Sequence, residues 1–192
     1  MIYFDNAATT LHKPDCVATA IINAINTFGN PSRGSHEAAM NGLRCLMQTR
    51  EEIADYFGLM DSRGVVFMQN ATMALNTIIS DIKGHIVTTA AEHNSVLRPI
   101  YRKNNYTIVP LNRRGELNLN ELEQAIQPKT EAVIMTHASN VTGNVYDIEA
   151  AGKIRFRSNI RFIVDAAQTA GLLPIDMQSC GITVLCTIGH KS

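Results

Sequence analysis

Apolar residues recur at helical spacing in the first third of the chain. Between Asp15 and Phe28 they stand at positions 17, 21, 22 and 25, which is close to the spacing of one helix face. A second stripe of this kind runs from about Ser35 to Phe57. The sequence GNPS at 29–32 separates the two stripes, and its residues favour turns. We therefore expect two helices, the first of them within an N-terminal arm over 1–30.

After residue 64, short apolar runs alternate with helical patterns. The runs expected to form strands are Val65–Met68, Ile86–Thr89, Thr107–Leu111, Ala132–Thr136, Ile160–Val164 and Ile182–Ile188. The helices between them are expected at 72–81, 94–103, 119–126 and 147–157. Apolar strands that alternate with helices are typical of a parallel sheet buried on both faces. The predicted fold class is therefore α/β, with a mostly parallel sheet and helices on both faces.

Composition narrows the class of protein further. The 192 residues are 45% hydrophobic and 18% charged, which suits one large globular domain over 1–192. Lys plus Arg and Asp plus Glu both number 17, so the chain lacks the basic surplus that nucleic-acid binding needs. No apolar run approaches the ~20 residues that span a bilayer, and the first residues do not resemble a signal peptide. We expect a cytoplasmic protein with neither nucleic acid nor membrane as a partner.

The four cysteines do not form a recognisable pattern. Cys16, Cys45, Cys180 and Cys186 include no C-x-x-C pair, so we expect reduced and mostly buried thiols. The spacing of cysteine and histidine does not match a structural zinc site. We therefore expect no metal.

Polar side chains stand directly after five of the predicted strands. They supply a hydroxyl, an imidazole, an amide, a carboxylate with an amide, and an amine, from Thr72, His93, Asn140, Asp165 with Gln168, and Lys191. Ligands of open α/β sheets bind outside the carboxyl ends of the strands, and these groups suit a polar, aromatic and anionic cofactor. Motifs for dinucleotides, for a P-loop and for a nucleophile elbow are absent from the sequence, which leaves those functions without support.

Six motifs then occur in a fixed order. They are FDNAATT at 4–10, NAT at 70–72, EHNSV at 92–96, SNVTG at 139–143, VDAAQ at 164–168 and GHK at 189–191. Each motif is weak by itself, but the ordered set resembles the class V aminotransferase family of pyridoxal-phosphate enzymes along the whole chain. The resemblance is to cysteine desulfurases and selenocysteine lyases in particular. It implies the large domain of a fold-type I enzyme, with pyridoxal 5'-phosphate as cofactor and cysteine or selenocysteine as substrate.

The resemblance also implies roles for single residues. Lys191 would hold the cofactor covalently and move protons at the substrate carbon, with His190 beside it. Asp165 would pair with the pyridine nitrogen and keep it protonated, which makes the ring an electron sink. Each has an ordinary alternative, because lysine is usually a surface residue and aspartate often caps a helix.

The remaining site residues follow from the same resemblance. Gln168 and Asn140 would face the phenolic oxygen of the cofactor, although a surface glutamine and a turn asparagine are the plain alternatives. Ala71 and Thr72 would bind the phosphate at a helix N-terminus, where Thr72 could also serve only as a cap. His93 would stack on the ring and, together with Lys191, would be catalytic. Histidine at this place favours the sulfur-handling enzymes over aminotransferases.

Two departures from the family pattern affect these expectations. The family usually has a phosphate-binding serine or threonine two residues before His190, where this chain has Ile188. Thr187 is its neighbour, but successive strand residues point to opposite faces, so we expect one phosphate ligand to be lost. Family members also continue well beyond the position of Ser192, with a small domain, a substrate-carboxylate arginine and a mobile cysteine loop.

We therefore expect an incomplete large domain that lacks full activity by itself. In the full-length family the resemblance implies a homodimer and a sulfur-acceptor protein as partner. The alternatives are a class V aminotransferase, another pyridoxal-phosphate lyase, or a non-catalytic remnant.

Overall fold

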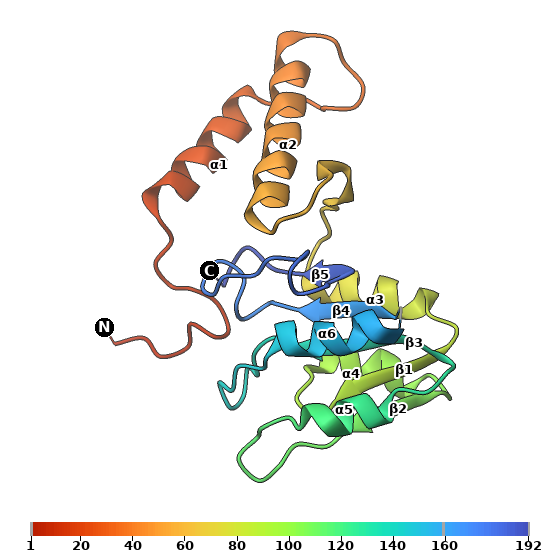
Figure 1. Ribbon diagram of the computed structural model, residues 1–192. Coiled ribbons are helices and arrows are strands. Elements are labelled where there is room, and N and C mark those ends of the chain that lie inside the picture. The colour runs from red at the N-terminus through yellow and green to blue at the C-terminus, as the bar shows by residue number, and fades with distance from the viewer. Residues whose placement is uncertain (1, 159, 192) are drawn as a thin grey trace. The chain divides into compact units, whose positions relative to one another are not determined.

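The computed structural model describes residues 2–158 and 160–191. It divides into two compact units, Met1–Val66 and Phe67–Ser192, and its elements are labelled in Figure 1. In the part of the chain that is described, no helix has the length and apolar character needed to cross a membrane.

The first unit contains the two helices that the periodicity predicts. These are α1 (Asp15–Thr27) and α2 (Glu37–Tyr56), and the short 3-10 helix η1 (Ser62–Gly64) follows them. Helix α2 begins after His36, whose Nδ1 accepts a hydrogen bond from the Ala39 N–H at 3.4 Å. No residue of α1 is buried. Both predicted helices are thus present, but the apolar stripe of α1 faces solvent.

The second unit holds the sheet. Its elements are α3 (Ala71–Asp81), β1 (His85–Thr89), α4 (Asn94–Tyr101), β2 (Tyr106–Val109), α5 (Leu119–Ala125), β3 (Thr130–Thr136), α6 (Ile148–Ser158), β4 (Arg161–Asp165) and β5 (Val184–Cys186). All four predicted helices and five of the predicted strands are found. The last strand is shorter than predicted, because pairing with β4 ends at Cys186.

The five strands are ordered β2-β1-β3-β4-β5, and all four pairings are parallel. Helices α3 and α4 lie on one face of the sheet and α5 and α6 on the other (Figure 1). This confirms the predicted α/β class. On the α3 and α4 face, a buried cluster joins these helices to four strands through Leu75, Ile79, Ile82, Ile86, Val96, Ile100, Ala132, Ile134, Ile163 and Cys186. Each fully buried leucine or isoleucine stabilises the fold by roughly 1.5–3 kcal/mol.

The prediction of a strand at Val65–Met68 was wrong. These residues form no strand, and Val66 and Phe67 are 70% and 49% exposed. A strand forms only when a neighbour accepts and donates its backbone hydrogen bonds. None of the described strands pairs with this segment, so its apolar composition alone does not produce a strand.

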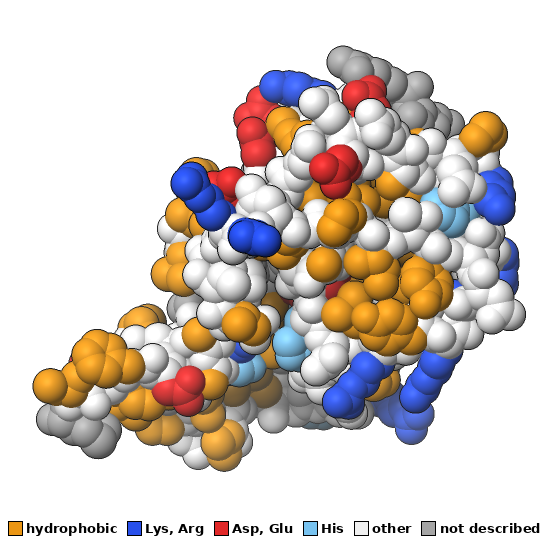
Figure 2. Space-filling model, turned by 90° about the horizontal axis from the view of Figure 1, so that it is seen from below, with side chains coloured by type: hydrophobic (Ala, Val, Ile, Leu, Met, Phe, Trp, Pro, Cys, Tyr) orange, Lys and Arg blue, Asp and Glu red, His pale blue; other side chains and the backbone are white. Residues whose placement is uncertain are grey.

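The surface of the molecule mixes apolar and basic groups. Seen from below, one of the groups of hydrophobic side chains has Lys and Arg side chains beside it (Figure 2). Among the exposed apolar residues are Tyr101 and Tyr106, whose rings meet edge to face with centroids 6.1 Å apart. The surface of the second unit near β2 is therefore not uniformly polar.

The strand order reverses between β1 and β3, because β1 is flanked by β2 on one side and β3 on the other. Such a reversal opens a crevice outside the carboxyl ends of the two strands. Glu92 joins these ends, since its Oε1 accepts hydrogen bonds from the Thr89 hydroxyl at 2.6 Å and the Thr136 N–H at 2.9 Å. Glu92 is 6% exposed. Burial raises its pKa to about 8, against the lowering effect of those two hydrogen bonds, and the nearby Asp165 charge raises it as well.

The Glu92 carboxyl should make stability depend on pH. Its pKa in the folded chain, about 8, exceeds its ordinary value of 4.5, so the folded state binds more protons between these values. The contribution of Glu92 is fully present below about pH 4.5 and is lost as the pH rises through about 8, at no more than about 1.4 kcal/mol for each pH unit. Glu92→Gln keeps a neutral carbonyl acceptor and should flatten this dependence.

The measurement is urea unfolding of both chains at about pH 5, 6.5 and 8. The difference between parent and variant isolates Glu92, because histidines titrate in both. Equal slopes with pH would show that Glu92 does not stay protonated in the fold.

A second prediction concerns the close approach of α6 to the segment before β5. A Cβ added at Gly152 would lie 1.8 Å from the Cys180 carbonyl oxygen. Alanine normally stabilises a helix relative to glycine by about 1 kcal/mol, but here the backbone must move, at a cost of about 1–3 kcal/mol or more. Gly152→Ala should therefore lower the urea midpoint. Lys153→Ala, at the exposed next position, is the control and should change it little.

Candidate functional site

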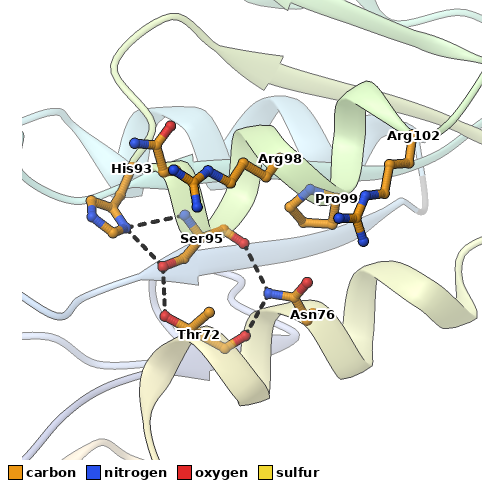
Figure 3. Close-up of a pocket in the computed structure, with 8 residues that line it drawn as sticks. Thr72, Asn76, His93, Ser95, Arg98, Pro99 and Arg102 are labelled. Atoms are coloured by element: carbon orange, nitrogen blue, oxygen red, sulfur yellow. Dashed lines mark hydrogen bonds between the residues drawn. The ribbon is translucent and has the colours of Figure 1, made fainter.

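A chain of hydrogen bonds links the start of α3 to the start of α4 (Figure 3). Helix α3 begins after Asn70, whose Oδ1 accepts the Met73 N–H at 2.9 Å. Its second residue, Thr72, places Oγ1 2.8 Å from the hydroxyl oxygen of Ser95. The Ser95 hydroxyl oxygen lies 2.7 Å from Nδ1 of His93. Two residues expected in the site are thus joined through a third.

His93 is also the N-cap of α4. Its Nδ1 accepts the backbone N–H of Ser95 at 3.1 Å. A backbone N–H can only donate, so Nδ1 must carry a lone pair and the neutral ring carries its proton on Nε2. The local helix start therefore fixes which nitrogen of His93 is a donor.

A pocket of about 220 Å³ lies between α3 and α4. Its lining consists of Thr72, Asn76, His93, Asn94, Ser95, Arg98, Pro99 and Arg102, and Figure 3 shows these side chains. No acidic side chain lines it, whereas Arg98 and Arg102 do. Its charge is therefore suited to anions.

Asp165 lies at the carboxyl end of β4 and is 5% exposed. In the sheet register it is flanked by Thr136 and Cys186. Burial raises its pKa, while the Ala167 N–H, which donates to Oδ1 at 3.0 Å, and the charges of His93 and Lys191 lower it. The charges of His93 and of Lys191 therefore both act on Asp165, in one region of the second unit.

Lys191 and His190 follow β5. Lys191 is half-buried and His190 is exposed. Thr187 and Ile188 are both half-buried and lie beyond the end of the strand at Cys186. The expectation that strand alternation turns Thr187 and Ile188 to opposite faces was therefore wrong in its premise, because alternation applies only within a strand.

The other expected site residues occupy the same end of the sheet. Ala71 is the buried first residue of α3. Asn140 is exposed in the turn after β3, and in the described residues no hydrogen bond joins it to Asp165 or Lys191. Gln168 is half-buried in the turn after β4. Their roles toward a cofactor stay predictions.

The expectation of mostly buried thiols was wrong for half of the cysteines. All four are free, with Cys16 and Cys45 exposed and Cys180 and Cys186 buried. The exposed pair lies on α1 and α2, whose outer faces are solvated. Burial, together with the Asp165 charge, raises the pKa of Cys186 to about 12, so this thiol stays protonated near neutral pH and is a poor nucleophile.

Two residues of this region were not singled out from the sequence. Glu92 and Ser95 belong to the same motif as His93, but their contacts are with residues far along the chain, at Thr136 and Thr72. A serine two residues after a helix cap is a weak signal. Only the approach of α3 to α4 gives Ser95 its second partner.

The chain is similar to known proteins in its sequence and in its fold. The profile of the family Aminotransferase class-V matches residues 2–192. A probable cysteine desulfurase of Borreliella burgdorferi is 30% identical over all of this chain and 48% of its own length. The cysteine desulfurase IscS of Pectobacterium carotovorum is 35% identical over 99% of this chain and 50% of its own length. The chain thus spans about half the length of the curated relatives it matches.

Solved structures give the same result. The structure described as SspA in complex with cysteine superposes with a TM-score of 0.90 and 31% identity, over all of this chain and 58% of that one. The apo cysteine desulfurase from Thermococcus onnurineus superposes with a TM-score of 0.88 and 29% identity, over 98% of this chain and 50% of that one. With a family match over almost every residue and this agreement in fold, the chain belongs to the class V aminotransferase family and is similar to its cysteine desulfurases.

Proposed function

We propose that this chain binds pyridoxal phosphate and is the cofactor-binding part of a cysteine desulfurase. The observation that carries the proposal is the buried Asp165 carboxylate, on which the charges of His93 and Lys191 act. The Ala167 N–H donates a hydrogen bond to Oδ1 of this carboxylate at 3.0 Å. A buried carboxylate is costly unless donors or cations meet it. A protonated pyridine nitrogen is such a donor, so the residues present fit the cofactor.

The other residues of the region fit the rest of the cofactor. Thr72 offers a hydroxyl at the first turn of α3, where backbone N–H groups favour a phosphate. His93 offers an aromatic ring whose neutral form donates from Nε2. Gln168 and Asn140 offer amide donors for the phenolic oxygen. The cofactor, when bound, would withdraw electrons from the substrate carbon.

The proton chemistry belongs to Lys191 and Asp165. The Lys191 amine would attach the cofactor and then move a proton at the substrate carbon. The Asp165 charge would hold a proton on the pyridine nitrogen. In the desulfurase reaction the carbon–sulfur bond of cysteine breaks, the sulfur passes to an acceptor thiol, and the carbon that loses sulfur takes up a proton to give alanine.

The acceptor thiol is the part that the second unit does not offer. Cys186 is buried with a pKa raised to about 12, and burial also raises the pKa of Cys180. We propose that the acceptor belongs to a further part of the full-length protein or to a partner protein. Cysteine as substrate belongs to the same proposal, supported by the names of the cysteine desulfurase relatives. Selenocysteine as an alternative substrate, a homodimer and a cytoplasmic location are proposed with it from the family resemblance of the sequence motifs.

Lys191→Ala tests the attachment. Pyridoxal phosphate followed by borohydride should label the parent chain at Lys191, because reduction fixes the amine–cofactor bond, and the variant should lose this label while keeping weak binding. Peptide mass spectrometry locates the label. Lys153→Ala is the control, since Lys153 is exposed and paired with Glu149. Label that persists in Lys191→Ala would assign the cofactor to another amine.

Asp165→Asn tests the charge on the ring nitrogen. The label at Lys191 should still form, but the affinity for pyridoxal phosphate should fall at least about tenfold, the factor for about 1.4 kcal/mol, since one partner of a buried charge pair is removed. Inorganic phosphate should bind parent and variant equally, because it has no ring. Titration by fluorescence or calorimetry measures both ligands. Unchanged affinity for pyridoxal phosphate would remove Asp165 from its proposed role.

A further inference from the structure

The Ser95 hydroxyl lies between Thr72 and His93. Its oxygen is 2.8 Å from Thr72 Oγ1 and 2.7 Å from His93 Nδ1, and the residue is 7% exposed. Figure 3 shows the three groups in line from α3 to α4. A hydroxyl has a single proton, so Ser95 can donate to one of these neighbours and must accept from the other.

The protonation of His93 decides the direction of this chain. While the ring is neutral, Nδ1 accepts, as the Ser95 N–H requires. The Ser95 hydroxyl then donates to His93, and the Thr72 hydroxyl donates to Ser95. When Nδ1 gains a proton, it no longer accepts the Ser95 N–H and instead donates to the Ser95 hydroxyl oxygen, so that the Ser95 hydroxyl donates to Thr72. The Thr72 hydroxyl then no longer donates to Ser95, and its proton can form a hydrogen bond with another acceptor.

The released Thr72 hydroxyl can donate to an anion. It stands at the first turn of α3, and the pocket beside it contains Arg98 and Arg102 but no carboxylate. An oxyanion that accepts a hydrogen bond from the Thr72 hydroxyl therefore favours the orientation of these hydrogen bonds in which His93 is protonated. By thermodynamic reciprocity, protonation of His93 favours binding of the oxyanion.

We propose that Ser95 is a positioning residue that couples an oxyanion held by Thr72 to the protonation of His93. The proposal rests on the proposed function in one respect: there, the oxyanion is the cofactor phosphate. Inorganic phosphate presents the same oxygens and serves as the probe.

Charges also act on His93 directly, and they must be separated from the hydroxyl chain. Asp165 at the end of β4 interacts with His93, and Lys191 after β5 acts on Asp165. Arg98 on α4 and Arg102, the C-cap of that helix, line the same pocket. The α3 groups that line it, Thr72 and Asn76, are uncharged. Ser95→Ala leaves all of these charges in place and removes only the hydroxyl, so it isolates the coupling.

The experiment measures His93 in the full 192-residue chain labelled with ¹⁵N. Imidazole nitrogen shifts at one fixed pH near neutrality give the ratio of protonated to neutral ring, before and after addition of inorganic phosphate, with His93→Gln used to assign the signals. In the parent chain phosphate should raise this ratio roughly three- to tenfold, the factor that one hydrogen bond contributes. In Ser95→Ala the increase should fall to the small part due to the phosphate charge. Ser95→Thr retains a hydroxyl and should restore it.

Thr72→Val, alone and combined with Ser95→Ala, gives a double-mutant cycle. It should weaken the response as Ser95→Ala does, and the double variant should lose no more than either single change, because both interrupt one path. A full response in Ser95→Ala, additive losses, or no response in the parent chain would each overturn the coupling. A response of His93 to phosphate without a borohydride label at Lys191 would support the coupling and contradict the proposed function. A label at Lys191 without a response of His93 to phosphate would support the proposed function and overturn the coupling.

Discussion

Parallel pairing requires the carboxyl ends of all five strands to lie at one edge of the sheet. Everything described in the second unit depends on that requirement. Thr136, Asp165 and Cys186 are neighbours only because the ladder sets them in register. The reversal of strand order beside β1 then separates the connections on either side. Residues more than a hundred positions apart, such as Thr72 and Lys191, therefore come from segments at the same end of the unit.

Two buried carboxyl groups at this edge have different neighbours. Glu92 has its Oε1 occupied by two donors and lies deep between β1 and β3, so burial keeps it neutral. Asp165 is also buried, and burial raises its pKa, but the Ala167 N–H and the charges of His93 and Lys191 oppose that rise. One carboxyl group thus serves as a neutral link between strands, and the other is suited to hold a cationic group. Environment, rather than residue type, separates the two.

Periodicity was enough to predict most elements, because helices α3 to α6 and strands β1 to β4 each carry a clear apolar pattern. It failed at Val65–Met68, since a pattern of apolar residues does not say whether a neighbouring strand is present. The ordered motifs identified the family and pointed to Asp165 and Lys191. They could not point to Ser95, whose importance depends on Thr72, 23 residues earlier. They also could not predict the exposure of Cys16 and Cys45, which depends on what covers α1 and α2.

His93 combines an observed role as a helix cap with the role in the cofactor site that we propose for it. Its Nδ1 caps the start of α4 by accepting the Ser95 N–H, while the same ring also acts electrostatically on Asp165. Helix caps contribute about 1 kcal/mol, so loss of this ring weakens the scaffold as well as the site. The choice of residue at this position is therefore restricted on two independent grounds. An asparagine at this position, like the Asn70 that caps α3, would cap the helix without supplying the ring. Comparing the asparagine variant with an alanine variant would therefore separate the loss of the cap from the loss of the ring.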